Sequence, residues 1–126
     1  MIRILIADDH PFVREGLRML IECEDDMQVV AEASDGREAI AEFRATRPDV
    51  VVMDIHMPNC NGLEATAAIC REFPDCRIIV FSTNVDSAYF SGAHDCGAMV
   101  YLPKETDPRE IVETIRRTAT LPRRTG

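Results

Sequence analysis

Five short apolar runs, separated by longer segments with helical spacing, constrain the fold of this chain more than any other feature. Three of the runs show little or no alternation and are rich in Val and Ile, which is typical of strands buried on both faces of a sheet. Repeated strand-then-helix units predict an α/β fold with an open parallel sheet and helices on both of its faces. The predicted strands are residues 2–7, 28–33, 50–53, 77–81 and 98–102.

The predicted helices have recognisable first turns. A capping residue followed three positions later by glutamate resembles a capping box. This pattern occurs at Asp35–Glu38, Asn61–Glu64 and Asp107–Glu110. Pro11 is predicted to be the first residue of another helix, where its missing N–H costs nothing. His10 is then the N-cap and a mediocre one, which weakens helix capping as the explanation for the adjacent acids Asp8 and Asp9.

Composition and charge narrow the classes of function. At 126 residues the chain is one domain of ordinary size, predicted to span 1–119, with the basic tail 120–126 as the start of a linker or an artificial end. A formal net charge of −8 argues against nucleic acid binding by this chain itself. The five cysteines contain no C-x-x-C pair, which favours reduced thiols in a cytoplasmic protein. No apolar run approaches the roughly 20 residues that a membrane span needs.

Charged side chains follow several of the predicted strands. In an open α/β sheet, ligands bind outside the carboxyl ends of the strands. The strands deliver Asp8 and Asp9, Asp54, Ser82 and Lys104 to that edge. Three carboxylates without a cation repel one another and raise one another's pKa. A hard divalent ion with oxygen ligands, most naturally Mg²⁺, resolves this repulsion.

The same cluster predicts phosphoryl chemistry. The three carboxylates carry −3, and Lys104 together with Mg²⁺ returns +3, so the cluster is ready for an incoming anion. Phosphoryl transfer depends on positioning and on neutralising the charge of the oxygens. A carboxylate can act as the nucleophile and form an acyl phosphate. Lys104 and the Ser82 hydroxyl are then the groups that bind phosphoryl oxygens.

Four blocks of sequence carry a family resemblance. They are "ILIADDHPFVREGL", "VVVMDIHMPNCNGLEA", "VFSTN" and "GAMVYLPKE". In this order they resemble the receiver domain of bacterial two-component response regulators, over residues 2 to about 119. The pattern "DDHPFVREGL…EASDGREAI" is similar to the NarL/LuxR-type branch, in which the receiver usually precedes a helix-turn-helix DNA-binding domain. The resemblance implies a flavodoxin-like (CheY-like) (βα)5 fold, doubly wound, with strand order 2-1-3-4-5.

The resemblance also implies the chemistry of the site. Asp54 is expected to be the phosphoacceptor, with Ser82 and Lys104 binding the phosphoryl group. Asp9 is expected to be a direct Mg²⁺ ligand and Asp8 to hold metal-bound waters. Asp54 and the backbone carbonyl of His56 complete the expected metal ligands.

Switching and output are implied in the same way. Tyr101 is expected to pack inward when Ser82 moves, and His56 and Asn84 to tune hydrolysis of the acyl phosphate. The expected phosphodonor is a sensor histidine kinase, and phosphorylation is expected to produce a homodimer. Such a domain is not an enzyme beyond Mg²⁺-dependent self-phosphotransfer and autodephosphorylation. Contact with DNA is expected only through an effector domain absent from this chain.

Some features depart from the family pattern or suit other classes. Pro103 precedes Lys104, whereas many receivers have proline directly after the lysine, so the shape of the Lys104–Glu105 peptide stays open. The D-x-H pattern at Asp54 and His56 also occurs in metallophosphoesterases, but their further Asn, His and Asp blocks are missing. A flavin-binding domain of the same architecture needs a phosphate loop after the first strand, where Asp8 and Asp9 repel phosphate. A stand-alone regulator that docks to a partner protein stays open beside a receiver separated from its effector.

Overall fold

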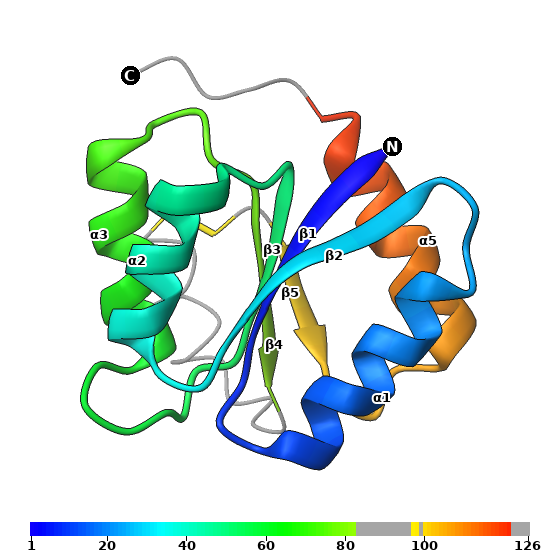
Figure 1. Ribbon diagram of the computed structural model, residues 1–126, viewed down its shortest axis with the longest axis horizontal. Coiled ribbons are helices and arrows are strands. Elements are labelled where there is room, and N and C mark those ends of the chain that lie inside the picture. Colours follow the sequence, from blue (N-terminus) through cyan, green and yellow to red (C-terminus); the bar gives the residue numbers. More distant parts are fainter. Residues whose placement is uncertain (83–96, 99, 122–126) are drawn as a thin grey trace.

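The sheet has five parallel strands in the order β2-β1-β3-β4-β5, as predicted (Figure 1). The computed structural model describes residues 1–82, 97–98 and 100–121. The observed strand ends differ from the predicted ones by at most two residues, because runs of buried Val and Ile mark strands covered on both faces. The strands are β1 (Ile2–Ala7), β2 (Met27–Ala33), β3 (Val50–Met53), β4 (Ile78–Ser82) and β5 (Val100–Pro103).

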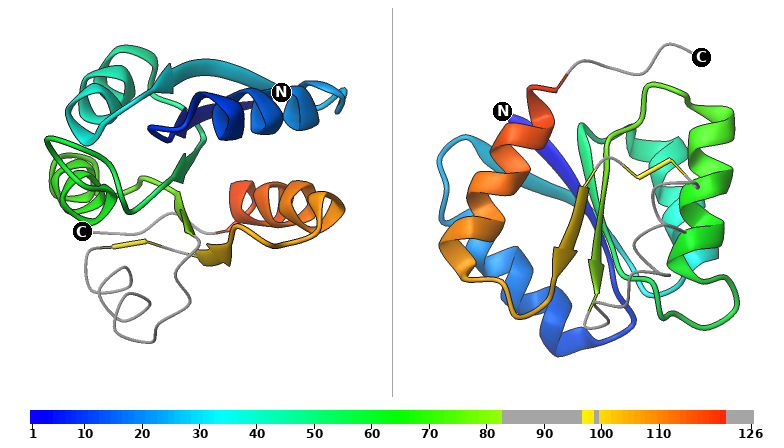
Figure 2. Two further views of the ribbon diagram at one scale, coloured as in Figure 1. Left: turned by 90° about the horizontal axis from the view of Figure 1, so that it is seen from below. Right: turned by 180° about the vertical axis from the view of Figure 1, so that it is seen from behind.

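Helices cover both faces of the sheet. Helices α1 and α5 lie on one face, and α2 and α3 lie on the other (Figures 1 and 2). Their bounds are α1 (Pro11–Glu22), α2 (Gly36–Thr46), α3 (Gly62–Glu72) and α5 (Pro108–Ala119). The helix expected between β4 and β5 falls within 83–96, outside the described residues. Within the described part of the chain, no helix combines the length and apolar character that crossing a membrane requires.

Alternate residues of the central strands form the two halves of the core. Ile4 and Ile6 pack on the side of α1 and α5. Leu5 and Ala7 pack on the side of α2 and α3. This separation follows from the two-residue period of a strand, which sends successive side chains to opposite faces. Both layers hold β1 in place, and β1 therefore presents its carboxyl end at a fixed position.

Only one of the three predicted capping boxes is complete. At α3, Glu64 N–H donates to Asn61 Oδ1 (2.9 Å) and Asn61 N–H donates to Glu64 Oε1 (3.3 Å). At α2, Asp35 accepts from Glu38 N–H, but the Glu38 carboxylate accepts from the N–H and hydroxyl of Ser34, both at 2.7 Å. Ser34 offers two donors at one place, which explains the difference.

The other two helices begin at proline. At α5, Asp107 accepts from Arg109 N–H (2.9 Å), one position earlier than in a capping box. His10 is the N-cap of α1 and makes no side-chain capping bond, as predicted. The side chains of Asp8 to His10 are therefore not engaged in capping α1.

Candidate functional site

Asp8, Asp54 and Lys104 meet at the carboxyl edge of the sheet, at the bottom of Figure 1. Lys104 Nζ lies 2.8 Å from Asp8 Oδ2 and 3.5 Å from Asp54 Oδ2. Backbone hydrogen bonds fix the strand ends: Asp54 N–H donates to the carbonyl of Ala7, and Lys104 N–H donates to that of Ser82, each at 2.9 Å. The sheet thus brings together charged residues that lie far apart in the sequence.

The two carboxylates beside Lys104 are almost completely buried. The exposed fractions are 1% for Asp8, 3% for Asp54 and 12% for the Lys104 side chain. The Oδ2 atoms of Asp8 and Asp54 face Lys104, and no other hydrogen-bond donor reaches them among the described residues. Burying charge without full hydrogen bonding is costly, and a single lysine does not compensate two aspartates. The site is therefore short of positive charge.

The surroundings of Asp54 disfavour the negative charge of its carboxylate. Burial raises the pKa of its carboxyl above the ordinary value, and the charge of Asp8 raises the pKa further. Lys104 and the backbone N–H of His56, which hydrogen-bonds this carboxylate, lower the pKa and do not fully compensate. A cation placed here would offset both the cost of burying the Asp54 charge and its repulsion by Asp8, which together raise the pKa.

Four side chains offer potential metal ligands at this edge. One ligand atom from each lies within 4.8 Å of the others, and among the described residues this is the only such group: Asp8, Asp9, His10 and Asp54. Carboxylate oxygens suit Mg²⁺, and the buried Oδ2 atoms of Asp8 and Asp54, which share one lysine, keep lone pairs that an ion could use. His10 was not among the predicted ligands, and the only signal for it is its position directly after the acidic pair.

The remaining predicted site residues differ in their burial and in their surroundings. Ser82 is fully buried at the end of β4, and Tyr101 is half-buried against Ile55, Val80 and Ala98. The His56 side chain is exposed, and a metal contact through its carbonyl stays a prediction. Asn84 lies outside the described residues. The part of the chain that is described contains no cis peptide bond, so Lys104–Glu105 is trans.

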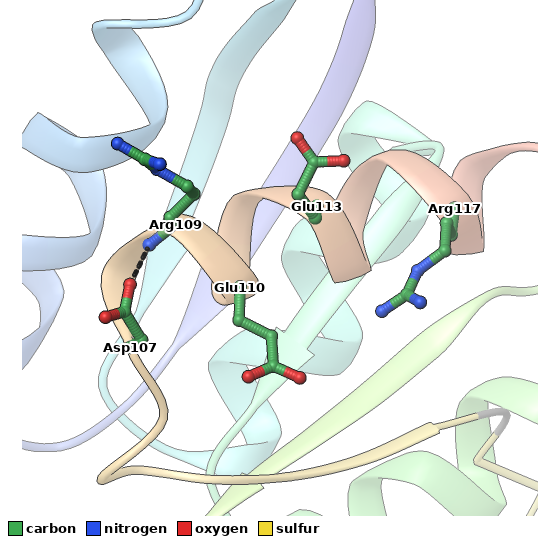
Figure 3. A pocket seen from close by; sticks show the side chains of 5 residues that line it. All are labelled: Asp107, Arg109, Glu110, Glu113 and Arg117. Carbon is green, nitrogen blue, oxygen red and sulfur yellow. Dashed lines mark hydrogen bonds between the residues drawn. The ribbon is translucent and has the colours of Figure 1, made fainter.

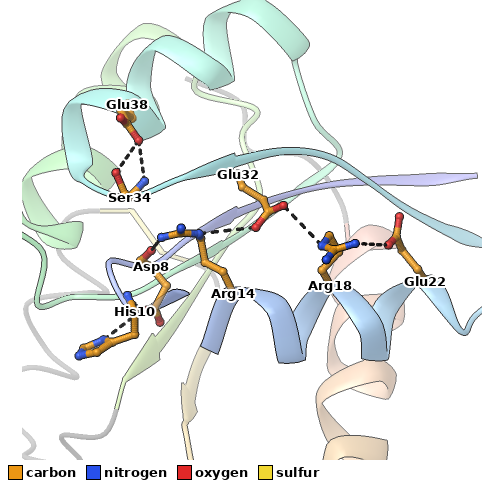
Figure 4. Close-up of polar contacts among 8 residues, drawn as sticks. All are labelled: Asp8, His10, Arg14, Arg18, Glu22, Glu32, Ser34 and Glu38. Carbon is orange, nitrogen blue, oxygen red and sulfur yellow. Dashed lines mark hydrogen bonds and ion pairs between the residues drawn. The ribbon is translucent and has the colours of Figure 1, made fainter. Parts of the chain in front are cut away.

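Arg14 on α1 holds the backbone of the acidic pair, a contact that the sequence did not reveal. Its Nη1 donates to the carbonyl of Asp8 at 2.6 Å. Glu32 on β2 lies 3.5 Å from Arg14 Nε and 3.6 Å from Arg18 Nε (Figure 4). The turn after β1 is thus tied to both α1 and β2. Arg14 touches the site through the backbone, whereas Arg18 pairs with the same glutamate without reaching Asp8.

We expect Arg14→Met to weaken divalent cation binding by about tenfold, the size typical of groups that orient metal ligands. Losing a positive charge near the site would by itself strengthen cation binding, so a weaker affinity reports lost positioning. The measurement is a calorimetric titration with Mg²⁺. Arg18→Met removes the same kind of side chain from the same glutamate and is the matched control. Equal affinities for the two variants, or tighter binding by Arg14→Met, would contradict the positioning role.

Known proteins resemble this chain over most of its length. The model of the family described as response regulator receiver domain matches residues 4–116. The uncharacterized transcriptional regulatory protein YxjL of Bacillus subtilis is 42% identical over 94% of this chain and 54% of its own length. The transcriptional regulatory protein LiaR of the same species is 41% identical over 92% of this chain and 55% of its own. The chain therefore spans about half the length of these relatives.

Solved structures give the same result. A two-component response regulator of the LuxR family from Aurantimonas sp. SI85-9A1 superposes with a TM-score of 0.92 at 42% identity, covering 98% of this chain and 88% of that one. The receiver domain of the putative response regulator NarL from Mycobacterium tuberculosis gives 0.89 at 32% identity, covering 94% and 95%. The relatives of this chain are of the NarL/LuxR type. Because the family model matches nearly the whole length of this chain, the chain belongs to the response regulator receiver domains of two-component systems.

Proposed function

We propose that this domain is switched by phosphorylation of Asp54, with a sensor histidine kinase as the phosphodonor. The observation that carries the proposal is the pair of buried carboxylates, Asp8 and Asp54, whose Oδ2 atoms both face the single ammonium group of Lys104. This arrangement suits a nucleophile beside a cation and an anion-binding ammonium group. Asp8, Asp9 and Asp54 would hold Mg²⁺, which supplies neutralisation of phosphoryl oxygens when it is bound.

The proposed reaction is a transfer between the two proteins. A carboxylate oxygen of Asp54 attacks the phosphorus of a phosphohistidine, forming an O–P bond. The P–N bond breaks, and its electron pair stays on the imidazole of the donor. Lys104, already 3.5 Å from Asp54 Oδ2, pairs with one oxygen of the transferred group. The Ser82 hydroxyl binds another, which couples the phosphoryl group to the end of β4 and to Tyr101 on the neighbouring strand.

The proposed output is transcriptional and acts through a longer protein. The relatives are transcriptional regulators about twice as long as the matched region, which supports a DNA-binding effector domain that follows the receiver. The formal net charge of −8 supports the view that this domain itself does not hold DNA. Within this proposal the protein works in the cytoplasm, and the receiver has no activity beyond its own phosphorylation and dephosphorylation.

The proposed response to phosphorylation includes a homodimer formed through the face of β5 and α5. The exposed side of α5 is hollowed and carries both signs of charge, from Asp107, Arg109, Glu110, Glu113 and Arg117 (Figure 3). Mixed charges on one face suit pairing with a second copy, since opposite charges then oppose one another across a two-fold axis. The proposed face also includes residues 85–95, which lie outside the described residues.

The test is the intact mass of the protein after incubation with acetyl phosphate and Mg²⁺. We expect a gain of one phosphoryl group per chain, and no gain when a chelator removes the metal. Hydroxylamine should reverse the gain, because an acyl phosphate is cleaved by this nucleophile whereas a phosphate ester is not. A gain that survives the chelator, or one that resists hydroxylamine, would show that the site does not work in this way.

A further inference from the structure

The His10 imidazole faces the acidic pair. Nδ1 lies 3.2 Å from Asp8 Oδ1, as Figure 4 shows, and 3.0 Å from Asp9 Oδ1. The backbone N–H of His10 also donates to Asp8 Oδ1, at 2.9 Å, which fixes the start of the side chain next to the site. The side chain is 63% exposed and makes no capping bond to α1. The ring can therefore adjust its angle at the mouth of the site without disturbing the core.

Two almost completely buried carboxylates also belong to the site that the His10 ring faces. Asp8 and Asp54 are 1% and 3% exposed, and a single lysine, Lys104, faces both of their buried Oδ2 atoms. Together with Asp9 and His10 they form the group whose ligand atoms lie within 4.8 Å of one another. The potential ligand set therefore contains three carboxylates and one nitrogen.

The nitrogen changes which ions the site prefers. Mg²⁺ is a hard ion that takes oxygen ligands and keeps several waters, so an imidazole adds little to its binding. Imidazole suits Zn²⁺, Ni²⁺ and Cu²⁺, and the affinity of a mixed nitrogen and oxygen site rises from Mn²⁺ through Co²⁺ and Ni²⁺ to Cu²⁺ before it falls at Zn²⁺. A site with carboxylates alone would discriminate less strongly between these ions and Mg²⁺.

We propose that His10 is a metal-selecting ligand: its imidazole binds divalent transition ions at the aspartate cluster, whereas Mg²⁺ is held through oxygen alone. The inference shares Asp8, Asp9 and Asp54 with the proposed function and rests on it only to that extent. A transition ion held with the help of His10 competes with Mg²⁺ for the same aspartates. Phosphorylation of Asp54 thereby becomes sensitive to the supply of such ions.

The experiment is a titration of the protein with Co²⁺, followed by its visible d–d absorption, and a parallel calorimetric titration with Mg²⁺. We expect His10→Ala to weaken Co²⁺ binding by about tenfold or more and to shift the absorption toward that of an all-oxygen site. The affinity for Mg²⁺ should change by less than about threefold, because no nitrogen ligand is lost. His10→Gln, which keeps a polar side chain without the imidazole, should behave as His10→Ala does.

Phe12→Ala is the matched control. Phe12 is an exposed aromatic side chain two positions after His10, and it offers no metal-ligand atom. This variant should keep the Co²⁺ affinity and spectrum of the parent protein. A His10→Ala protein with the parent's Co²⁺ affinity and spectrum would overturn the proposal, and so would equal losses of Co²⁺ and Mg²⁺ affinity.

The two hypotheses fail separately. Mg²⁺-dependent labelling of Asp54 by acetyl phosphate is measured without any transition ion, so its failure would remove the proposed function alone. Selective loss of Co²⁺ binding in His10→Ala supports the selecting role whether or not Asp54 is labelled. Thermal unfolding without metal, measured for each variant, verifies that His10→Ala is folded before its affinities are compared.

Discussion

Replacing Asp54 with asparagine is expected to abolish phosphoryl labelling and, in the absence of divalent cations, to stabilise the protein. The amide offers no carboxylate oxygen to attack phosphorus, so the gain of one phosphoryl group should disappear. The same change removes one of two buried negative charges that share a single lysine. The folded protein thus holds the Asp54 carboxylate in an environment that disfavours its negative charge.

The stabilising effect should depend on pH with a definite sign. Burial and the charge of Asp8 raise the pKa of Asp54 in the folded protein above the ordinary value of 3.8. Below that value the carboxyl is protonated in both the folded and the unfolded state, so the pKa shift does not change the free energy of unfolding. As the pH rises, the unfolded chain loses its proton first, so the free energy of unfolding falls until the pH passes the raised pKa. The advantage of Asp54→Asn should therefore grow with pH over this window.

Urea unfolding at several pH values, with a chelator present, measures this difference. Adding Mg²⁺ should narrow the gap, because the parent protein regains a cation between its carboxylates. Asp25→Asn, which changes an exposed aspartate, is the control and should alter neither labelling nor the pH dependence. Full labelling of Asp54→Asn, or a variant less stable than the parent at neutral pH without metal, would be incompatible with this account.

The sequence predicted the sheet well because its strands carry a strong local signal. Val50 to Met53 are all buried, and such a run suits a strand covered on both faces. The strand order then brings the carboxyl ends of β1, β3 and β5 to one edge. Asp8, Asp54 and Lys104 each follow one of these strands directly, so their meeting could be expected from the topology alone.

The contacts around this edge could not be predicted because they depend on the packing between elements. Arg14 reaches the carbonyl of Asp8 only because α1 lies beside β2, where Glu32 holds the guanidinium. No local sequence pattern predicts the angle between that helix and the strand. The direction of the His10 ring is a choice of side-chain rotamer, and the sequence offers three or more. The capping box of α2 is incomplete for a similar reason, because the Glu38 carboxylate accepts from two donors on Ser34.

Gly62→Ala is expected to be among the most damaging substitutions in this protein, although it adds a single methyl group. A Cβ at this position would lie 1.9 Å from the carbonyl oxygen of Asp54 and 2.9 Å from Cα of Ile55. Gly62 N–H also donates to the carbonyl of Ile55 at 2.8 Å, so α3 begins directly against this backbone. Both obstacles are main-chain atoms, and no side chain can rotate to make room.

Either α3 or the segment that carries Asp54 must move, which we expect to cost about 3 kcal/mol in the free energy of unfolding. The displacement should also lower the rate of labelling, because Asp54 is part of the segment that shifts. Gly16→Ala is the matched control: it lies in the middle of α1, and an added Cβ meets nothing within 4 Å. There alanine should stabilise the helix by up to about 1 kcal/mol. Urea unfolding of both variants measures the contrast, and a Gly62→Ala protein as stable as Gly16→Ala would show that α3 does not fix the position of Asp54.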